Sequence, residues 1–196
     1  MSKKVLIIIF GVLVFSISNV LAVLPAAIVA MAEAGQFAGP EIYTQAAESG
    51  QLGELIQAYP NQIQPEQLDF ANPQIQSQWG EARNSLSPQQ QLAGDNKYLA
   101  SKNCPEFSSA PKDLQINGDK FTIGGKEYNV KDFQAFKGQG EMAVGNDGTL
   151  NINLNDGATI QEANFKNLGK NGIKINSNGI SNIKNAETQL GKTNIM

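Results

Sequence analysis

The sequence contains no histidine, and this absence excludes several common kinds of chemistry. Ser-His-Asp and Cys-His catalysis, histidine metal sites and histidine pH switches all require that side chain. There is also a single cysteine, Cys104, so no disulfide can form within the chain. In an oxidising compartment a lone cysteine is either buried and inert or able to bond to another chain, and we predict the first.

A concentrated basic segment is missing as well. Residues 33–96 hold eight acidic residues and one basic residue, Arg83, which is a formal charge of −7. Residues 97–196 carry twelve lysines against ten acidic residues, and these lysines are scattered. Nucleic-acid binding needs clustered cations that displace counterions from phosphates, so we predict that the protein binds no nucleic acid.

Two lysines and a long apolar run begin the chain. Lys3-Lys4 is followed by a mostly apolar stretch from Val5 to Ala32. A basic start, an apolar core and small residues near Ala22 and Ala32 predict a cleaved secretory signal peptide. The alternative is a retained membrane anchor over residues 1–32, because the stretch exceeds the roughly 20 residues that span a bilayer. Under both hypotheses residues 33–196 are exported, to the cell envelope or out of the cell.

Residues 33–104 form an acidic region with thirteen glutamines between positions 36 and 91, and its apolar spacing predicts helices. The first helix begins at Gly39-Pro40-Glu41, is disturbed at Gly50 and stops at Tyr59-Pro60. From there to Pro73 we expect a loop or short helical turns.

Two more helices are predicted in this region. One runs from Pro73 to Leu86 and places Trp79 in the core, although an exposed Trp79 would be a sugar-stacking platform. The other begins at Ser87-Pro88 and is interrupted at Gly94-Asp95-Asn96. We expect the whole region to be a packing domain or a cap rather than a dedicated binding domain.

Residues 105–139 have the alternating pattern of short strands. Three period-two fragments are separated by residue pairs that favour hairpin turns: Leu114-x-Ile116, Asn117-Gly118, Phe121-x-Ile123, Gly124-Gly125 and Tyr128-x-Val130. This pattern predicts antiparallel hairpins.

One pattern occurs twice in the last part of the chain. Ile-x-x-Ala is found at Ile160 and again at Ile183, an offset of 23 residues. Leu-Gly-Lys is found at Leu168 and again at Leu190, an offset of 22 residues. Such spacing is typical of a solenoid, in which each unit buries its apolar side against the next. Two partial copies can also arise by chance.

With its short strands and Asn-Gly turns, the segment over about residues 140–196 resembles right-handed parallel β-helix proteins of the secreted and cell-surface type. The resemblance implies an α+β protein in which a helical region and the segment 105–139 precede stacked coils. It also implies that Ile160 lies over Ile183 and Leu168 over Leu190. Because the second copy stops at Met196 without a cap, we expect a longer solenoid or self-association through this edge.

No residue is predicted to be catalytic, to bind a cofactor or to bind a metal. Asn151, Asn153, Asn155 and Glu162 have the spacing of a calcium loop, but amides replace its carboxylates and Asp156 stands where glycine is needed. Asp147 and Asp156 each lie in an Asx-Gly turn, where the side chain would cap its own backbone.

Three hypotheses about function remain open. The favoured one is an exported, non-catalytic surface or envelope protein that contacts other proteins or glycans and meets the membrane only through residues 1–32. The first alternative is the N-terminal part of a secreted β-helix polysaccharide hydrolase or lyase, whose active coils would lie beyond residue 196. The second alternative is a membrane-anchored structural spacer.

Overall fold

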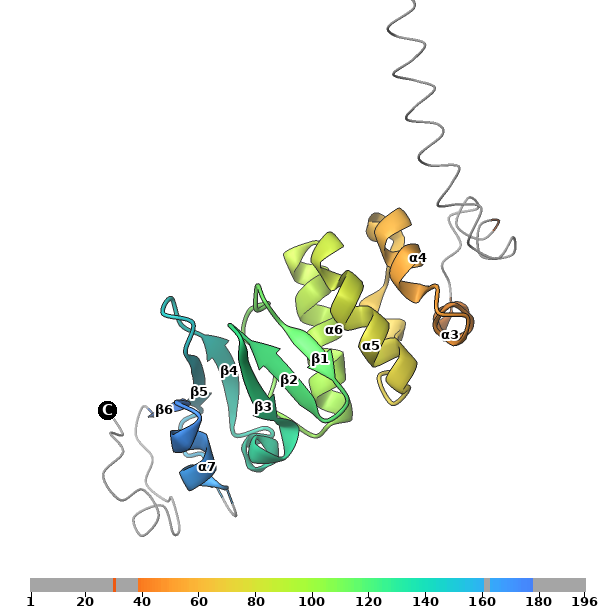
Figure 1. Ribbon diagram of the computed structural model, residues 1–196. Coiled ribbons are helices and arrows are strands. Elements are labelled where there is room, and N and C mark those ends of the chain that lie inside the picture. Colours follow the sequence, from red (N-terminus) through yellow and green to blue (C-terminus); the bar gives the residue numbers. More distant parts are fainter. Residues whose placement is uncertain (1–29, 31–38, 161–162, 178–196) are drawn as a thin grey trace, which may run out of the picture.

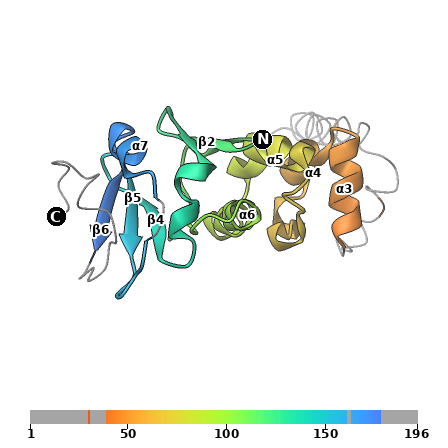
Figure 2. The same cartoon turned by 90° about the horizontal axis from the view of Figure 1, so that it is seen from below.

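The computed structural model describes residue 30, residues 39–160 and residues 163–177. Helices come first and two three-stranded sheets follow, which confirms the predicted α+β class (Figure 1). The described part is elongated, with α3 (Pro40–Glu48) at one end and β6 (Lys174–Ser177) at the other (Figure 2). Apart from residue 30, the predicted signal peptide or anchor lies outside the described residues. Among the residues that are described, no helix combines the length and the apolar character needed to cross a membrane.

The first predicted helix forms as two, α3 and α4 (Leu52–Ala58). They are separated at Gly50, whose φ of 75° lies in the left-handed region that glycine adopts without a steric penalty. The predicted apolar face is buried in both helices: Ile42, Tyr43, Ala46 and Ala47 in α3, and Leu52, Leu55 and Ile56 in α4. After α4 the chain makes two short 3₁₀ turns, η1 (Pro60–Gln62) and η2 (Pro65–Gln67), as expected for this proline-rich stretch.

Two further helices complete the helical part. α5 (Pro73–Ala82) is capped by Asn72, whose side chain accepts a hydrogen bond from the Gln74 amide at 2.9 Å, and it ends in the 3₁₀ turn η3 (Arg83–Ser85). α6 (Pro88–Ser101) begins with a capping box formed by Ser87 and Gln90, which satisfies free backbone donors of the first turn.

The predicted interruption of α6 at Gly94-Asp95-Asn96 is wrong, because these residues make tertiary contacts instead of a turn. A Cβ atom on Gly94 would lie 2.2 Å from Cζ2 of Trp79, so the glycine makes room for the indole ring. The Asp95 carboxylate accepts a hydrogen bond from Trp79 Nε1 at 3.1 Å. The Asn96 side chain binds both backbone groups of Phe107, at 2.8 and 3.1 Å.

A buried ion pair joins η3, at the end of α5, to α6 and reaches toward the first sheet. Arg83 donates from Nε and Nη2 to the two carboxylate oxygens of Asp95, at 2.9 and 2.5 Å, and both side chains are fully buried. Arg83 Nη2 also donates to the backbone carbonyl of Pro111 at 3.2 Å. Burial raises the pKa of Asp95, while the hydrogen bonds and charge of Arg83 act in the opposite direction.

The first sheet consists of the predicted antiparallel hairpins. It contains β1 (Gln115–Asn117), β2 (Lys120–Ile123) and β3 (Lys126–Asn129), in that spatial order. One face carries polar side chains, and the other packs Ile116, Phe121, Ile123 and Tyr128 into the core. Two 3₁₀ turns, η4 (Val130–Asp132) and η5 (Gln134–Phe136), then lead to the second sheet.

The second sheet contradicts the predicted parallel β-helix. β4 (Gly140–Val144) and β5 (Leu150–Leu154) pair antiparallel, and β6 adds to β5 in parallel, so residues 140–177 make a small mixed sheet and not a coil. The short Asn146-Asp147-Gly148 turn is the physical reason: it reverses the chain at once, whereas a solenoid coil must bend gradually and return in parallel.

The first copy of the repeated pattern also folds differently from the prediction. Leu168-Gly169-Lys170 lies in the short helix α7 (Phe165–Lys170), which buries Phe165 and Leu168. The 23-residue spacing does recur in the register of β5 and β6, in which Asn151 lies opposite Lys174. Ile183, Leu190 and the chain end at Met196 lie outside the described residues, as do the predicted stacking pairs and the predicted last edge.

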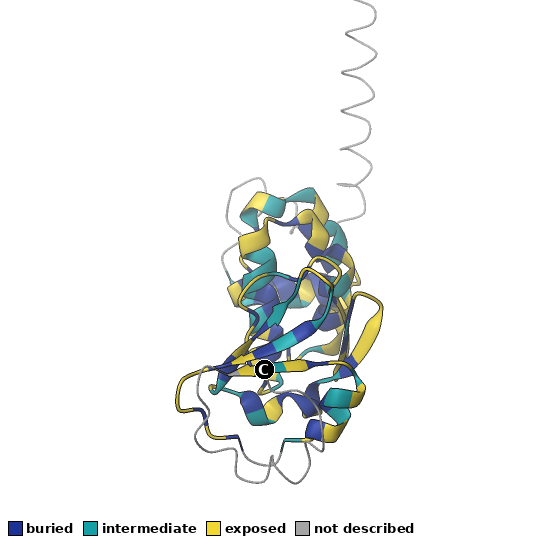
Figure 3. Cartoon of the chain, turned by 90° about the vertical axis from the view of Figure 1, so that its left-hand side faces the viewer, coloured by how far each residue is buried: buried dark blue, intermediate teal, exposed yellow. Residues whose placement is uncertain are grey.

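One continuous hydrophobic core runs through the described part, from Ile42 in α3 to Ile173 before β6. Buried and exposed residues alternate along its strands and around its helices (Figure 3). The first sheet and the helical part therefore pack as neighbours, and this places the polar face of the sheet beside α5.

Candidate functional site

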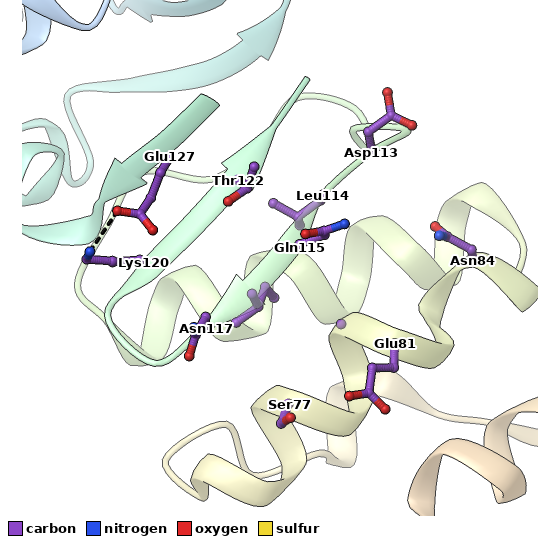
Figure 4. A pocket seen from close by; sticks show the side chains of 12 residues that line it. Ser77, Glu81, Asn84, Asp113, Leu114, Gln115, Asn117, Lys120, Thr122 and Glu127 are labelled. Atoms are coloured by element: carbon purple, nitrogen blue, oxygen red, sulfur yellow. Dashed lines mark hydrogen bonds and ion pairs between the residues drawn. The ribbon is translucent and has the colours of Figure 1, made fainter. Parts of the chain in front are cut away.

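A polar groove of about 670 Å³ lies between α5 and the first sheet, and we call it the α5–β1 groove (Figure 4). Its lining residues come from α5 and η3, from the segment that leads into β1, and from the three strands: Ser77, Gly80, Glu81, Asn84, Asp113, Leu114, Gln115, Ile116, Asn117, Lys120, Thr122 and Glu127. Most of them are polar or charged. The groove is the candidate functional site.

Close packing at Gly80 forms the floor of the groove. A Cβ on Gly80 would lie 3.2 Å from the backbone nitrogen of Ile116 and 3.5 Å from its carbonyl oxygen. α5 thus lies directly against β1, the edge strand of its sheet, and covers backbone groups there that would otherwise invite another strand. Glu81 and Asn84 continue along the same exposed side of α5 and η3 and form one wall.

Strand alternation supplies the other wall. Gln115 lies opposite Thr122, and Thr122 lies opposite Glu127, so these three side chains form one row across the outer face of the sheet. Asn117 and Lys120 form a second row beside it. Because alternate residues of a strand point to opposite faces, burying Ile116 and Phe121 places these polar residues in the groove.

The lining residues differ in whether they already have partners. Lys120 Nζ forms an ion pair with Glu127 Oε1 at 2.7 Å, and both side chains are at least half exposed. The Asn84 side chain accepts a hydrogen bond from Arg83 Nη1 at 3.1 Å. The remaining polar side chains make no hydrogen bond or ion pair within the described part of the chain: Ser77, Glu81, Asp113, Gln115, Asn117 and Thr122. These donors and acceptors are available to a ligand.

The buried Arg83–Asp95 pair holds the two walls in register. Arg83 follows α5 directly, and its guanidinium contacts Asp95 of α6, the Pro111 carbonyl and the side chain of Asn84 in the groove wall. Asp113 lies two residues beyond Pro111. A fully buried charge pair therefore links the α5 wall to the segment that leads into β1.

The structure settles the role of two residues considered from sequence. Trp79 is completely buried, which confirms it as a core residue and excludes it as a surface platform for sugars in this structure. Cys104 is also buried; its thiol lies 3.3 Å from the Val130 carbonyl oxygen, and burial raises its pKa to about 12. This agrees with an inert cysteine, since the thiolate is the reactive form.

Two of the residues with calcium-loop spacing lie on a strand. Asn151 and Asn153 belong to β5, and the Asn153 side chain accepts a hydrogen bond from Asn176 of β6 at 2.9 Å. Glu162 lies outside the described residues. Asp147 caps its turn as predicted, accepting from the Thr149 amide at 3.0 Å. Its pKa is lowered to about 2 by Thr149 and Lys174. In the described ranges, no three potential ligands of the His, Cys, Asp and Glu types gather around one point.

Sequence reasoning did not find the α5–β1 groove. The period-two pattern of the three strands predicts hairpins but does not indicate what lies beside their polar face. A signal was present in Gly80, because a glycine inside a helical pattern can have a packing reason. The sequence does not indicate that this other backbone is β1.

Comparisons with protein-family models, curated proteins and solved structures give no match for this chain, so the groove has to be interpreted from its own residues.

Proposed function

We propose that the protein is an exported, non-catalytic component of the cell envelope or surface that binds a glycan in the α5–β1 groove. The observation that carries the proposal is the set of polar groove side chains without partners among the described residues. Amide, hydroxyl and carboxylate groups form hydrogen bonds with the many hydroxyl groups of a saccharide. The groove volume of about 670 Å³ falls within the range of small-molecule sites.

The composition of the groove favours a glycan over a folded protein partner. Stable protein interfaces have a desolvated apolar centre in which aromatic residues are enriched. The apolar side chains that line this groove, Leu114 and Ile116, are themselves buried in the core. A ligand that is polar over most of its surface is the better match.

The N-terminal sequence supports export. Lys3-Lys4 followed by the apolar stretch to Ala32 has the order of regions found in secretory signals and in anchors. If residues 1–32 are retained as an anchor, the part of the chain that carries the groove is attached to the membrane surface instead of released. The spacer hypothesis therefore changes how the protein is attached, and the proposed groove stays the same. We do not propose a β-helix polysaccharide hydrolase or lyase, because the mixed second sheet contradicts the solenoid on which that hypothesis depended.

Export is tested by expressing the whole chain in a bacterium with a Sec pathway and separating its compartments. We expect the protein outside the cytoplasm, and its intact mass to show whether the chain begins at Met1 or after Ala22 or Ala32. A Leu13→Arg variant, which breaks the apolar core, should accumulate in the cytoplasm. Full-length wild-type protein that is soluble in the cytoplasm would contradict the proposal.

Glycan binding is tested with the exported protein on an array of oligosaccharides, followed by calorimetric titration of those that bind. A Gln115→Ala, Thr122→Ala double variant removes an amide and a hydroxyl from the middle of the groove. We expect binding to be about 5- to 150-fold weaker, because each of the two lost hydrogen bonds contributes about 0.5–1.5 kcal/mol.

The matched control is Gln57→Ala with Thr159→Ala, which removes the same groups from exposed positions outside the groove. It should bind like the wild type, and thermal unfolding should show that both variants are folded. Absence of any saccharide binding, or equal affinity of wild type and groove variant, would refute the proposed site.

A further inference from the structure

We infer that the α5–β1 groove selects saccharides that carry protonated amino groups over their neutral or N-acetylated counterparts; this inference rests on the proposed glycan-binding function. It starts from the charges on the groove. Three carboxylates line it, those of Glu81, Asp113 and Glu127, against the single ammonium group of Lys120.

The ammonium group of Lys120 does not compensate all three carboxylates. Its Nζ lies 2.7 Å from Glu127 Oε1, so this pair is neutral as a unit. Glu81 and Asp113 have no ion-pair partner in the described part of the chain. They come from different segments, Glu81 from α5 and Asp113 from the stretch before β1, as Figure 4 shows.

The other nearby cations do not enter the groove. The guanidinium of Arg83 is fully buried behind the α5 wall and is paired with Asp95. Lys112 precedes Asp113 in the sequence and is exposed, but it is not part of the lining. The groove thus carries two negative charges, one at each wall, that have no ion-pair partner among the described residues.

The ligand chemistry follows from this arrangement. A protonated amine donates charge-assisted hydrogen bonds to a carboxylate, which are stronger than bonds between neutral groups. Gln115, Asn117 and Thr122 lie on the sheet wall and offer neutral partners to sugar hydroxyls. N-acetylation replaces the ammonium with a neutral, bulkier amide, so it removes the attraction to Glu81 and Asp113.

The test compares two tetrasaccharides, one of glucosamine and one of N-acetylglucosamine, titrated into the exported protein at mildly acidic pH. We expect the glucosamine form to bind roughly 2- to 30-fold more tightly, because an exposed ion pair contributes about 0.2–1 kcal/mol and two are available. The preference should shrink at high salt. A Glu81→Gln, Asp113→Asn variant should lose the preference and keep the affinity for the N-acetylated form.

The control variant is Glu48→Gln with Asp156→Asn, which makes the same change in net charge at exposed positions outside the groove and should keep the preference. Equal affinity for both tetrasaccharides would overturn the inference and leave the proposed function standing. Failure of both to bind would overturn the inference, and failure of the whole oligosaccharide array would overturn the proposed function with it. Tetralysine serves as a probe for a basic peptide. If tetralysine binds the wild type more tightly than either saccharide does, and binds the Glu81→Gln, Asp113→Asn variant more weakly, the groove is a basic peptide site and the inference is overturned.

Discussion

An Asp95→Asn variant is expected to lose about 3–5 kcal/mol of unfolding free energy, because it leaves the buried Arg83 guanidinium without a counter-charge. Arg83 and Asp95 are both fully buried, and the Asp95 carboxylate accepts two hydrogen bonds from the guanidinium at 2.9 and 2.5 Å. The substitution removes the negative charge of that carboxylate. A small domain has only about 5–15 kcal/mol of net stability. Urea unfolding followed by the fluorescence of Trp79, the single tryptophan, measures the loss directly.

Two controls distinguish this effect from a general effect of removing a carboxylate. Asp119 pairs with Lys102 at 2.7 Å on the surface, and Asp119→Asn should leave the urea midpoint nearly unchanged, since water screens exposed pairs. The double variant Arg83→Met, Asp95→Asn leaves no unpaired buried charge, so it should be more stable than Asp95→Asn alone. A double variant that shows the summed losses of its two single variants would contradict this account.

A Gly94→Ala variant is expected to be destabilised by up to about 2 kcal/mol, although alanine is the better helix former. The added Cβ would lie 2.2 Å from Cζ2 and 2.4 Å from Cη2 of the buried Trp79 ring, and neither partner has free space. Overpacking of this kind costs about 1–3 kcal/mol and occasionally more. The roughly 1 kcal/mol gain in helix propensity offsets only part of it.

Gly53→Ala is the matched control, because it makes the same substitution in α4 where the nearest atom, the Cβ of Ala82, is 3.8 Å away. This variant should be unchanged or up to about 1 kcal/mol more stable. Trp79→Phe replaces the indole, whose ring atoms clash, with a smaller phenyl ring, so combining it with Gly94→Ala should cost less than the sum of the single losses. Strictly additive losses, or a stable Gly94→Ala variant, would show that the indole does not occupy the space over Gly94.

The α5–β1 groove depends on the same contacts. Arg83 reaches the Pro111 carbonyl and Asn84 from behind the wall, so the Asp95→Asn variant should also weaken glycan binding in proportion to the unfolded or loosened fraction. The groove variants described above change only side chains that are exposed or, for Thr122, half-buried. Stability measurements on both sets therefore separate loss of the site from loss of the fold.

Local patterns in the sequence were sufficient for the starts of α3, α5 and α6 and for the first sheet. Proline and capping residues start α3, α5 and α6, and period-two apolar residues with Asn117-Gly118 and Gly124-Gly125 specify two hairpins. These features act over a few residues, because they depend on backbone angles and on hydrogen bonds within one turn. For that reason they were readable without knowledge of any partner segment.

The tertiary structure decided the features that depend on contacts between distant segments. In the sequence, Gly94 indicates a break in the helix. In the structure it makes room for the ring of Trp79, which lies 15 residues earlier in the chain. The 23-residue spacing is compatible with a solenoid or with one parallel pair, and the tight turn at Asp147 together with α7 selects the pair. The α5–β1 groove likewise exists only because α5 packs on β1 at Gly80, and the buried Arg83–Asp95 pair maintains that arrangement. Side-chain volume and burial determine these outcomes, and both are set by residues far apart in the sequence.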